Sequence, residues 1–153
     1  LMTDTQCQGQ SRPRAIILIT IAMAITFSRF SMIAYFPHLK MYGGVDANAW
    51  FGPWLSDTIL GLLVPFMIFA LWRKKGPRIW AMLFAYNVLG AFDYAHGLMT
   101  QWHYPQMTEG QTPSVIYGSI SLGLVMNLWV AVLLMKGEII DHLAGRVTSR
   151  AEK

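Results

Sequence analysis

The sequence predicts an all-α integral membrane protein, built as a four-helix transmembrane bundle. Of its 153 residues, 54% are hydrophobic and only 13% are charged, which departs strongly from a soluble domain of average composition. Four apolar runs each approach the ~20 residues that a helix needs to cross a hydrocarbon core. They cover residues 15–36, 53–72, 79–99 and 115–135. We therefore expect a cytoplasmic leader at 1–14, the transmembrane bundle at 15–135 and an amphipathic cytoplasmic tail at 136–153.

The basic residues predict the orientation of the bundle, because Lys and Arg are retained on the cytoplasmic side of short loops. Ten of the 12 flank one side of the four runs: Arg12, Arg14, Arg73, Lys74, Lys75, Arg78, Lys136, Arg146, Arg150 and Lys153. Lys40 stands alone on the other side, and Arg29 lies inside the first run. We expect both termini to be cytoplasmic, at a bacterial inner membrane. The net charge of +4 comes from the flanking set, so no nucleic-acid partner is expected.

The connections predict which helices are neighbours. The turn RKKGPR at 73–78 is short and contains Gly and Pro, so the second and third spans should be antiparallel neighbours. The outer connections, 37–52 and 100–114, are longer and resemble loops that fold over the mouth of a bundle. The tail carries a helical stripe of apolar residues at Ile139, Ile140, Leu143 and Val147. This stripe predicts a helix that continues the fourth span or lies on the cytoplasmic surface.

Three spans bring ionisable residues to one depth. At a rise of about 1.5 Å per residue, Arg29 and Asp93 each lie ~21 Å from the cytoplasmic edge, and Asp57 lies ~24 Å from it. His96 follows about one helical turn above Asp93. A charge that faces lipid is costly, so we expect these groups to pair inside the bundle.

The paired charges allow a chemical and a structural interpretation. Two carboxylates exceed one guanidinium by a single negative charge, so either His96 is protonated or one Asp keeps its proton. A protonated acid beside an ionised one is suited to general acid/base catalysis. In the structural interpretation, an Arg29–Asp93 ion pair holds the helices together and Asp57 stabilises the start of the second helix.

Two amides form a second matched pair. Asn87 and Asn127 each lie ~12 Å from the cytoplasmic edge, so they would pair with each other or face one ligand. The third span carries a stripe of small and polar residues, which marks the face turned into a membrane bundle. The stripe holds Asn87, Gly90, Asp93, Tyr94 and Gly97. Below the two amides the spans are apolar, which counts against ion or proton translocation.

No cofactor and no metal ion is expected. Met99, His103 and Met107 have soft-ligand character, so a Cu(I)-type site can be imagined, but methionine usually fills apolar gaps. Haem would need an axial ligand such as His96 or Tyr94, and nothing in their spacing demands one.

The order of several residues resembles that of a known family, the membrane-bound styrene oxide isomerases. The resemblance rests on Trp50, Gly52, Pro53, Leu55, Asp57 where the family has Asn, the basic turn to Arg78, Asn87 and, with a shift of one residue, Tyr94. It implies a trimeric four-span bundle that uses haem to rearrange an aryl epoxide to an aldehyde. Phe51 stands where the family has its iron-ligating His, and Asn87 where it has Asp. Haem ligation therefore does not carry over.

These patterns together predict a membrane-embedded enzyme. It would open, isomerise, hydrolyse or cyclise a small lipophilic substrate of the epoxide or terpenoid kind. Soluble epoxide hydrolases of the limonene epoxide type group Asp, Arg and Asp in a similar way on an unrelated fold. Asp57 and Asp93 would share the catalytic proton and Arg29 would orient them. The expected substrate-binding residues are Asn87, Tyr94, His96, Asn127 and Trp54.

A second hypothesis makes the protein an accessory or small-molecule-binding subunit of a larger membrane complex. Its buried charges would then only fix helix packing. In either case the expected partners are a lipophilic small molecule and membrane lipid. The resemblance adds a homo-oligomer, a trimer, to these expectations.

Overall fold

A computed structural model describes residues 14–106 and 112–144, and within them every regular element is helical. The elements in chain order are α1 (Arg14–Thr26), η1 (Phe27–His38), α2 (Leu39–Tyr42), η2 (Ala47–Trp50), α3 (Phe51–Arg73), α4 (Pro77–His103), α5 (Pro113–Leu134) and α6 (Gly137–Ala144). The predicted all-α fold class is confirmed for these residues. Residues 1–13 of the expected leader and 145–153 of the expected tail, with Val147, lie outside the described part.

Three helical segments in the described part are long and apolar enough to cross a membrane. They are Arg14–Tyr42, Ala47–Arg73 and Pro113–Leu134. Helix α4 has 27 residues, but its polar stripe keeps it out of this set. The part of the chain that the structure describes is therefore all-helical, with three candidate membrane-spanning segments.

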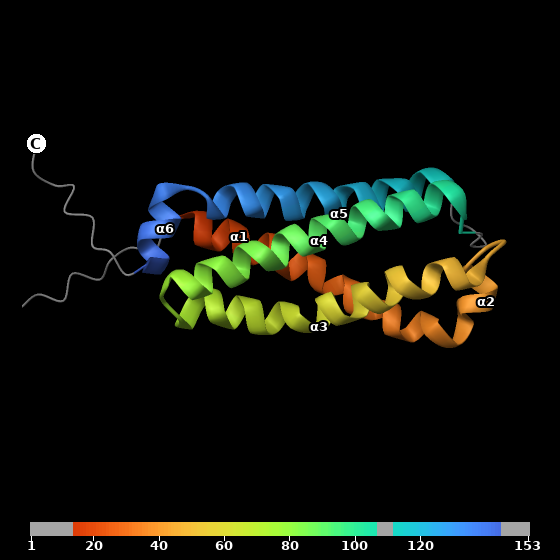
Figure 1. Cartoon of the computed structure of the whole chain (residues 1–153), viewed down its shortest axis with the longest axis horizontal. Coiled ribbons are helices and arrows are strands. Elements are labelled where there is room, and N and C mark those ends of the chain that lie inside the picture. The colour runs from red at the N-terminus through yellow and green to blue at the C-terminus, as the bar shows by residue number, and fades with distance from the viewer. Residues whose placement is uncertain (1–13, 107–111, 145–153) are drawn as a thin grey trace, which may run out of the picture.

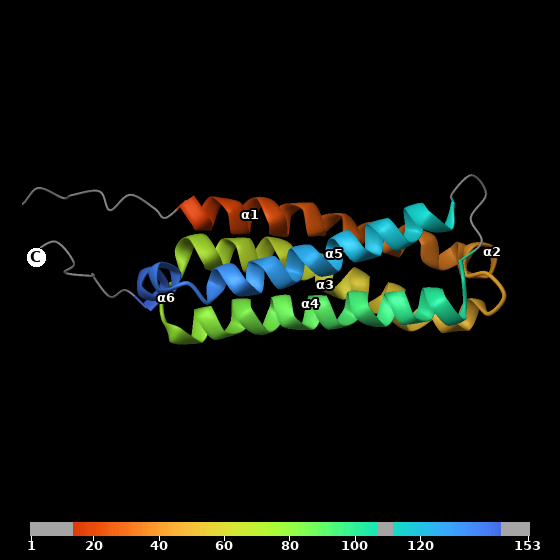
Figure 2. The same ribbon diagram turned by 90° about the horizontal axis from the view of Figure 1, so that it is seen from above.

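The long helices form a four-helix arrangement in which α1 and α4 lie diagonally opposite each other. Each of these two helices is flanked by α3 and α5, as Figures 1 and 2 show from two directions. The chain reverses between α3 and α4 at Gly76, which has a φ of +122° that favours glycine. Pro77 then occupies the first turn of α4, where its missing N–H is not needed. The predicted antiparallel contact of these two helices is confirmed.

The first helical rod is longer than the sequence indicates, and it changes from an α-helix to a 3-10 helix along its length. It was expected to end at residue 36, but η1 and α2 continue it to Tyr42. Over Phe27–His38 the rod is a 3-10 helix, in which residues three apart lie above one another. Arg29 and Met32 therefore share one edge of the rod, and Ser28 and Ser31 share the next.

Gly61 lets this 3-10 segment pack closely on α3. A Cβ atom at Gly61 would lie only 2.8 Å from the Cα of Phe30, so any larger residue would push the two backbones apart. The carboxylate of Asp57 lies one turn before Gly61 on α3. The close crossing therefore brings Arg29, the neighbour of Phe30, within reach of Asp57.

The tail forms a separate helix, α6, and this corrects one of the two sequence expectations. It does not continue α5, because α5 ends at Leu134 and α6 packs against α4. Its apolar stripe inserts Ile139 and Leu143, both 0% exposed, into the core. The backbone N–H of Gly76 donates to the carbonyl of Leu143 at 2.5 Å. In Figure 1, α6 closes the end of the bundle where α1 and α4 begin.

Candidate functional site

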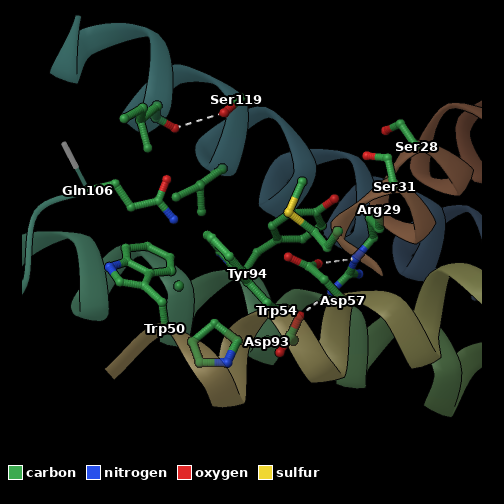
Figure 3. A pocket seen from close by; sticks show the side chains of 15 residues that line it. Ser28, Arg29, Ser31, Trp50, Trp54, Asp57, Asp93, Tyr94, Gln106 and Ser119 are labelled. Carbon is green, nitrogen blue, oxygen red and sulfur yellow. Dashed lines mark hydrogen bonds and ion pairs between the residues drawn. The ribbon is translucent and has the colours of Figure 1, made fainter. Parts of the chain in front are cut away.

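The candidate site is a cavity of about 320 Å³ in the half of the bundle away from α6. Its walls come from η1, the start of α3, the second half of α4 and the first half of α5, with Trp50 and Gln106. Figure 3 shows the charged residues Arg29, Asp57 and Asp93 toward one end and Trp50 with Gln106 toward the other. The volume lies at the lower end of the range for small-molecule sites.

Arg29 joins the two carboxylates in this cavity. Its Nε donates to Asp57 Oδ1 at 2.5 Å, and its Nη2 donates to Asp93 Oδ2. The arginine is 4% exposed, and the carbon of its guanidinium lies 4.2 Å from the centroid of the Tyr94 ring. Pairing with both carboxylates offsets the cost of burying this cation. The three residues that the depth argument predicts to be neighbours are thus in contact, while their catalytic role stays a prediction.

The two carboxylates have different surroundings. Both carboxylate oxygens of Asp93 have hydrogen-bond partners. Oδ2 accepts from Arg29, and Oδ1 is hydrogen-bonded to the hydroxyl of Ser56. The side chain of Asp57 is 22% exposed and that of Asp93 is 11% exposed. Asp57 is therefore the more exposed of the two carboxylates that line the cavity.

Ser56 is a site residue that sequence reasoning missed. Its hydroxyl lies within 3.0 Å of the carbonyls of Gly52 and Pro53 as well as beside Asp93. A hydroxyl has one hydrogen to donate, so Ser56 donates to an ionised Asp93 or accepts from a protonated one. A serine near a helix start ordinarily forms a hydrogen bond with its own backbone, so no sequence pattern indicates this contact with Asp93.

Tyr94 and Trp54, two of the predicted substrate-binding residues, line the cavity. The Tyr94 ring packs against Gly123 of α5, where any Cβ would collide with the ring. Trp54 is buried and meets Tyr35 and Phe36 edge to face. These contacts hold both aromatic side chains in place before any ligand arrives.

Asn87 and Asn127 are buried but do not line the cavity. Each amide nitrogen donates to a carbonyl of its own helix, Asn87 to Leu83 at 2.8 Å and Asn127 to Gly123 at 2.9 Å. No hydrogen bond joins the two amides in the described structure. Equal depth does not ensure that two side chains face each other, and here both amides are satisfied locally.

His96 lies outside the site. Its side chain is exposed on α4 and is absent from the cavity wall. Because His96 is not part of the cavity wall, the geometry gives no support to balancing the excess negative charge of the carboxylates with a proton on His96. A proton held between Asp57 and Asp93 is the alternative that the geometry leaves.

Several other wall residues were not predicted as ligand contacts. They are Ser28, Ser31, Met32, Trp50, Pro53, Gly97, Gln106, Ile116, Ser119 and Ile120. Ser28, Ser31 and Met32 come from η1, where they line the cavity together with Arg29. Trp50 is buried, and its indole N–H donates to the carbonyl of Tyr104 at 2.8 Å.

The described residues hold no group of three or more His, Cys, Asp or Glu side chains placed to bind a metal ion. Met107, one member of the imagined soft-metal site, lies outside them. His103 and Met99 do not line the cavity.

Comparisons of the chain with protein-family models, curated proteins and solved structures give no match. The resemblance to styrene oxide isomerases therefore stays a prediction from the sequence pattern. The features of the protein that point to a function are the geometry of Arg29, Asp57 and Asp93 and the walls of the cavity.

Proposed function

We propose that the protein is a membrane-embedded enzyme that opens or isomerises a small lipophilic substrate of the epoxide or terpenoid kind by carboxylate acid/base chemistry. One observation carries the proposal: two carboxylates from different helices bind one buried guanidinium in a cavity that also has apolar walls. Hydrolysis or cyclisation of such substrates would begin with the same proton transfer. The resemblance noted in the sequence agrees with this chemistry but supplies no ligand.

In the proposed mechanism Asp57 is the acid and Asp93 is its ionised partner. Asp93 has a donor on each oxygen, Arg29 and Ser56, and charge-assisted hydrogen bonds of this kind favour the anion. Asp57 is the more exposed of the two and holds the proton. Arg29 fixes both groups and positions the acid toward the cavity.

The first step transfers the proton of Asp57 to the epoxide oxygen while the C–O bond breaks and its electron pair stays on oxygen. In isomerisation, a hydride then migrates to the electron-poor carbon, and the hydroxyl proton returns to a carboxylate as the carbonyl forms. In hydrolysis, water attacks that carbon and gives its proton to a carboxylate. A carboxylate pair in a low-dielectric cavity can both deliver and recover the proton.

Substrate contacts are assigned to the residues that line the cavity. Trp54 and the isoleucines of α5 supply apolar surface, and Tyr94 and Ser119 supply hydroxyls beside it. Asn87 and Asn127 support the site from within the bundle, and His96 has no part in it. A lipophilic substrate would enter from the bilayer.

We further propose that α4 is a fourth span and that both termini are cytoplasmic. Helix α4 follows α3 after a tight turn and packs along α5 (Figure 1). Its 27 residues correspond to ~40 Å, enough to cross a ~30 Å core. Basic residues of the α3–α4 turn lie at the same end as the start of α1 and α6, which supports a cytoplasmic location for that end. A bacterial inner membrane and a homotrimer stay part of this proposal.

The decisive test is turnover by the purified protein in lipid nanodiscs. Styrene oxide and limonene oxide are supplied, and the aldehyde, ketone and diol products are quantified by chromatography. Asp57→Asn and Asp93→Asn should each lower the rate by about 10²-fold or more. Asp46→Asn is the matched control, because Asp46 is exposed and Asn can also accept from the N–H of Asn48. Folded Asp57 and Asp93 variants with unchanged turnover would rule out the mechanism.

A second candidate is favoured by the same ion pairs. Arg29 contacts both carboxylates at once, as it would in an accessory subunit whose charges only hold the helices together. In that case the purified protein would be inactive and co-purify with other subunits, and Asp93→Asn would lower stability with no activity to lose.

A further inference from the structure

The cavity carries one unbalanced charge. Among its 15 wall residues the charged side chains are Arg29 from η1, Asp57 from α3 and Asp93 from α4. Tyr94 of α4 is the other titratable group, and α5 contributes serine and apolar residues. Two ionised carboxylates and one guanidinium sum to −1. This excess charge can be neutralised by a proton on the Asp pair or by a bound monovalent cation.

Two indole side chains also line the cavity. Indole rings are the aromatic groups that attract cations most strongly, and both Trp50 and Trp54 are buried at the cavity wall. The N–H of Trp50 already donates to Tyr104, so that its hydrogen-bonding capacity is used within the protein. The Tyr94 ring already lies against the guanidinium of Arg29. The tryptophans are therefore the aromatic groups left to meet a second cation.

We propose that this cavity binds a small lipophilic monocation of the substituted ammonium class, in exchange for the proton that Asp57 and Asp93 share. A single positive charge matches the single excess negative charge. The volume of about 320 Å³ admits one aryl or terpenyl group with a trialkylammonium head. Apolar walls from Ile116, Ile120 and Met32 receive the hydrocarbon part. This binding does not depend on the epoxide chemistry proposed above.

Exchange of a cation for a proton makes binding depend on pH in a fixed direction. While the Asp pair holds its proton, raising the pH removes a competitor, so the affinity for the cation rises. The limit for one exchanged proton is about tenfold per pH unit. The affinity becomes constant once the pair is ionised in the free protein.

The test uses benzyltrimethylammonium and its neutral isostere neopentylbenzene, in which carbon replaces nitrogen. The quaternary cation has no proton to give or take, so any proton released on binding comes from the protein. Isothermal titration calorimetry of the full chain in detergent, between about pH 5 and pH 9 and in two buffers of different ionisation enthalpy, measures affinity and proton release together. Neopentylbenzene is then added as a competitor at equal concentration.

We expect saturable binding of one cation per chain, with an affinity that rises with pH. The neutral isostere should compete with the cation at least ten times more weakly than the cation itself binds. Asp57→Asn and Trp54→Leu should weaken binding at least tenfold, and Asp46→Asn should leave it unchanged. No binding, equal competition by the isostere or an affinity that does not change over the pH range would overturn the proposal.

These outcomes are separable from the proposed function. Because the isostere comparison uses the wild-type chain, it stays decisive even if a variant fails to fold. A protein that binds the cation but converts no epoxide would support this inference and contradict the enzymatic proposal. A protein that converts epoxides but ignores the cation would do the reverse.

Discussion

The two ends of the bundle differ in the kind of side chains that they bury. The α6 end, around Ile19, Leu83 and Ile139, is filled by apolar side chains. Polar groups at this end have partners within the bundle, such as the indole of Trp80, which donates to the carbonyl of Leu134 at 2.7 Å. The pocket end, around Arg29, Asp57 and Asp93, buries charges and keeps a cavity beside them.

This difference separates stability from chemistry along the same helices. In lipid, apolar helix faces gain little from meeting each other, and close packing with satisfied polar groups decides association. The α6 end meets that requirement with apolar packing and with polar groups paired inside the protein. The pocket end meets it with an ion triad whose excess charge must be neutralised by a proton or a ligand.

Removing the guanidinium should have the largest effect. Arg29→Met leaves two buried carboxylates without their cation, and breaking a buried pair costs about 3–5 kcal/mol. We expect a sharply lower unfolding temperature, which is measured by tryptophan fluorescence in detergent. Arg78→Met, which removes an exposed arginine of the α3–α4 turn, should change it little.

A separate variant tests whether the stability lost in Arg29→Met is lost because the carboxylates are left unpaired. Combining Arg29→Met with Asp57→Asn and Asp93→Asn removes all three charges, so much of the stability should return. If the triple variant is as unstable as Arg29→Met, then Arg29 stabilises the bundle through packing and the contrast between the two ends is weaker than inferred.

At the α6 end, Ile139→Ala should cost about 2–5 kcal/mol of stability because it opens a cavity in a closely packed region. The same change should leave turnover and cation binding as in the wild type, since Ile139 is remote from the site. Ile140→Ala on the same helix, where the side chain is half-buried, should cost less. A large loss of ligand binding at a temperature where the variant is folded would show that the two ends are coupled.

The crossing of η1 over α3 should respond to a single methyl group. Gly61→Ala would place its Cβ against the backbone of Phe30, and overpacking of this kind costs about 1–3 kcal/mol. The crossing also positions Arg29 beside Asp57. Turnover should therefore fall by more than the loss of stability alone would cause. Gly52→Ala is the matched control on the same helix, since no atom lies within 4 Å of its added Cβ. Equal effects at the two glycines would contradict the close crossing.

The depth of the polar side chains along the bundle was predictable from the sequence. The direction in which each of them points around its helix axis was not. The fixed rise per residue places Arg29, Asp57 and Asp93 at one height, and the cost of isolated charges then brings them together. Asn87 and Asn127 also share a height, but an amide can bond its own helix, so nothing forces them to meet. The 3-10 segment and the docking of α6 depend on tertiary contacts that no local pattern encodes. The cavity itself is a property of packing and has no sequence signal.

The smallest expected effect concerns Ser56, and it distinguishes the ionised from the protonated form of Asp93. If Ser56 donates to an anionic Asp93, Ser56→Ala removes one hydrogen bond, with a stability cost of about 0.5–1.5 kcal/mol. Turnover should fall and its pH profile should shift, because Asp93 loses a donor that favours its charge. Thr58→Val is the control, as the Thr58 hydroxyl donates at 2.9 Å to the carbonyl of Trp54 in its own helix. Ser56→Thr keeps the hydroxyl and should restore the wild-type pH profile. An unchanged profile in Ser56→Ala would mean that Arg29 alone sets the charge of Asp93, and the assignment of acid and anion within the pair would then lose its basis.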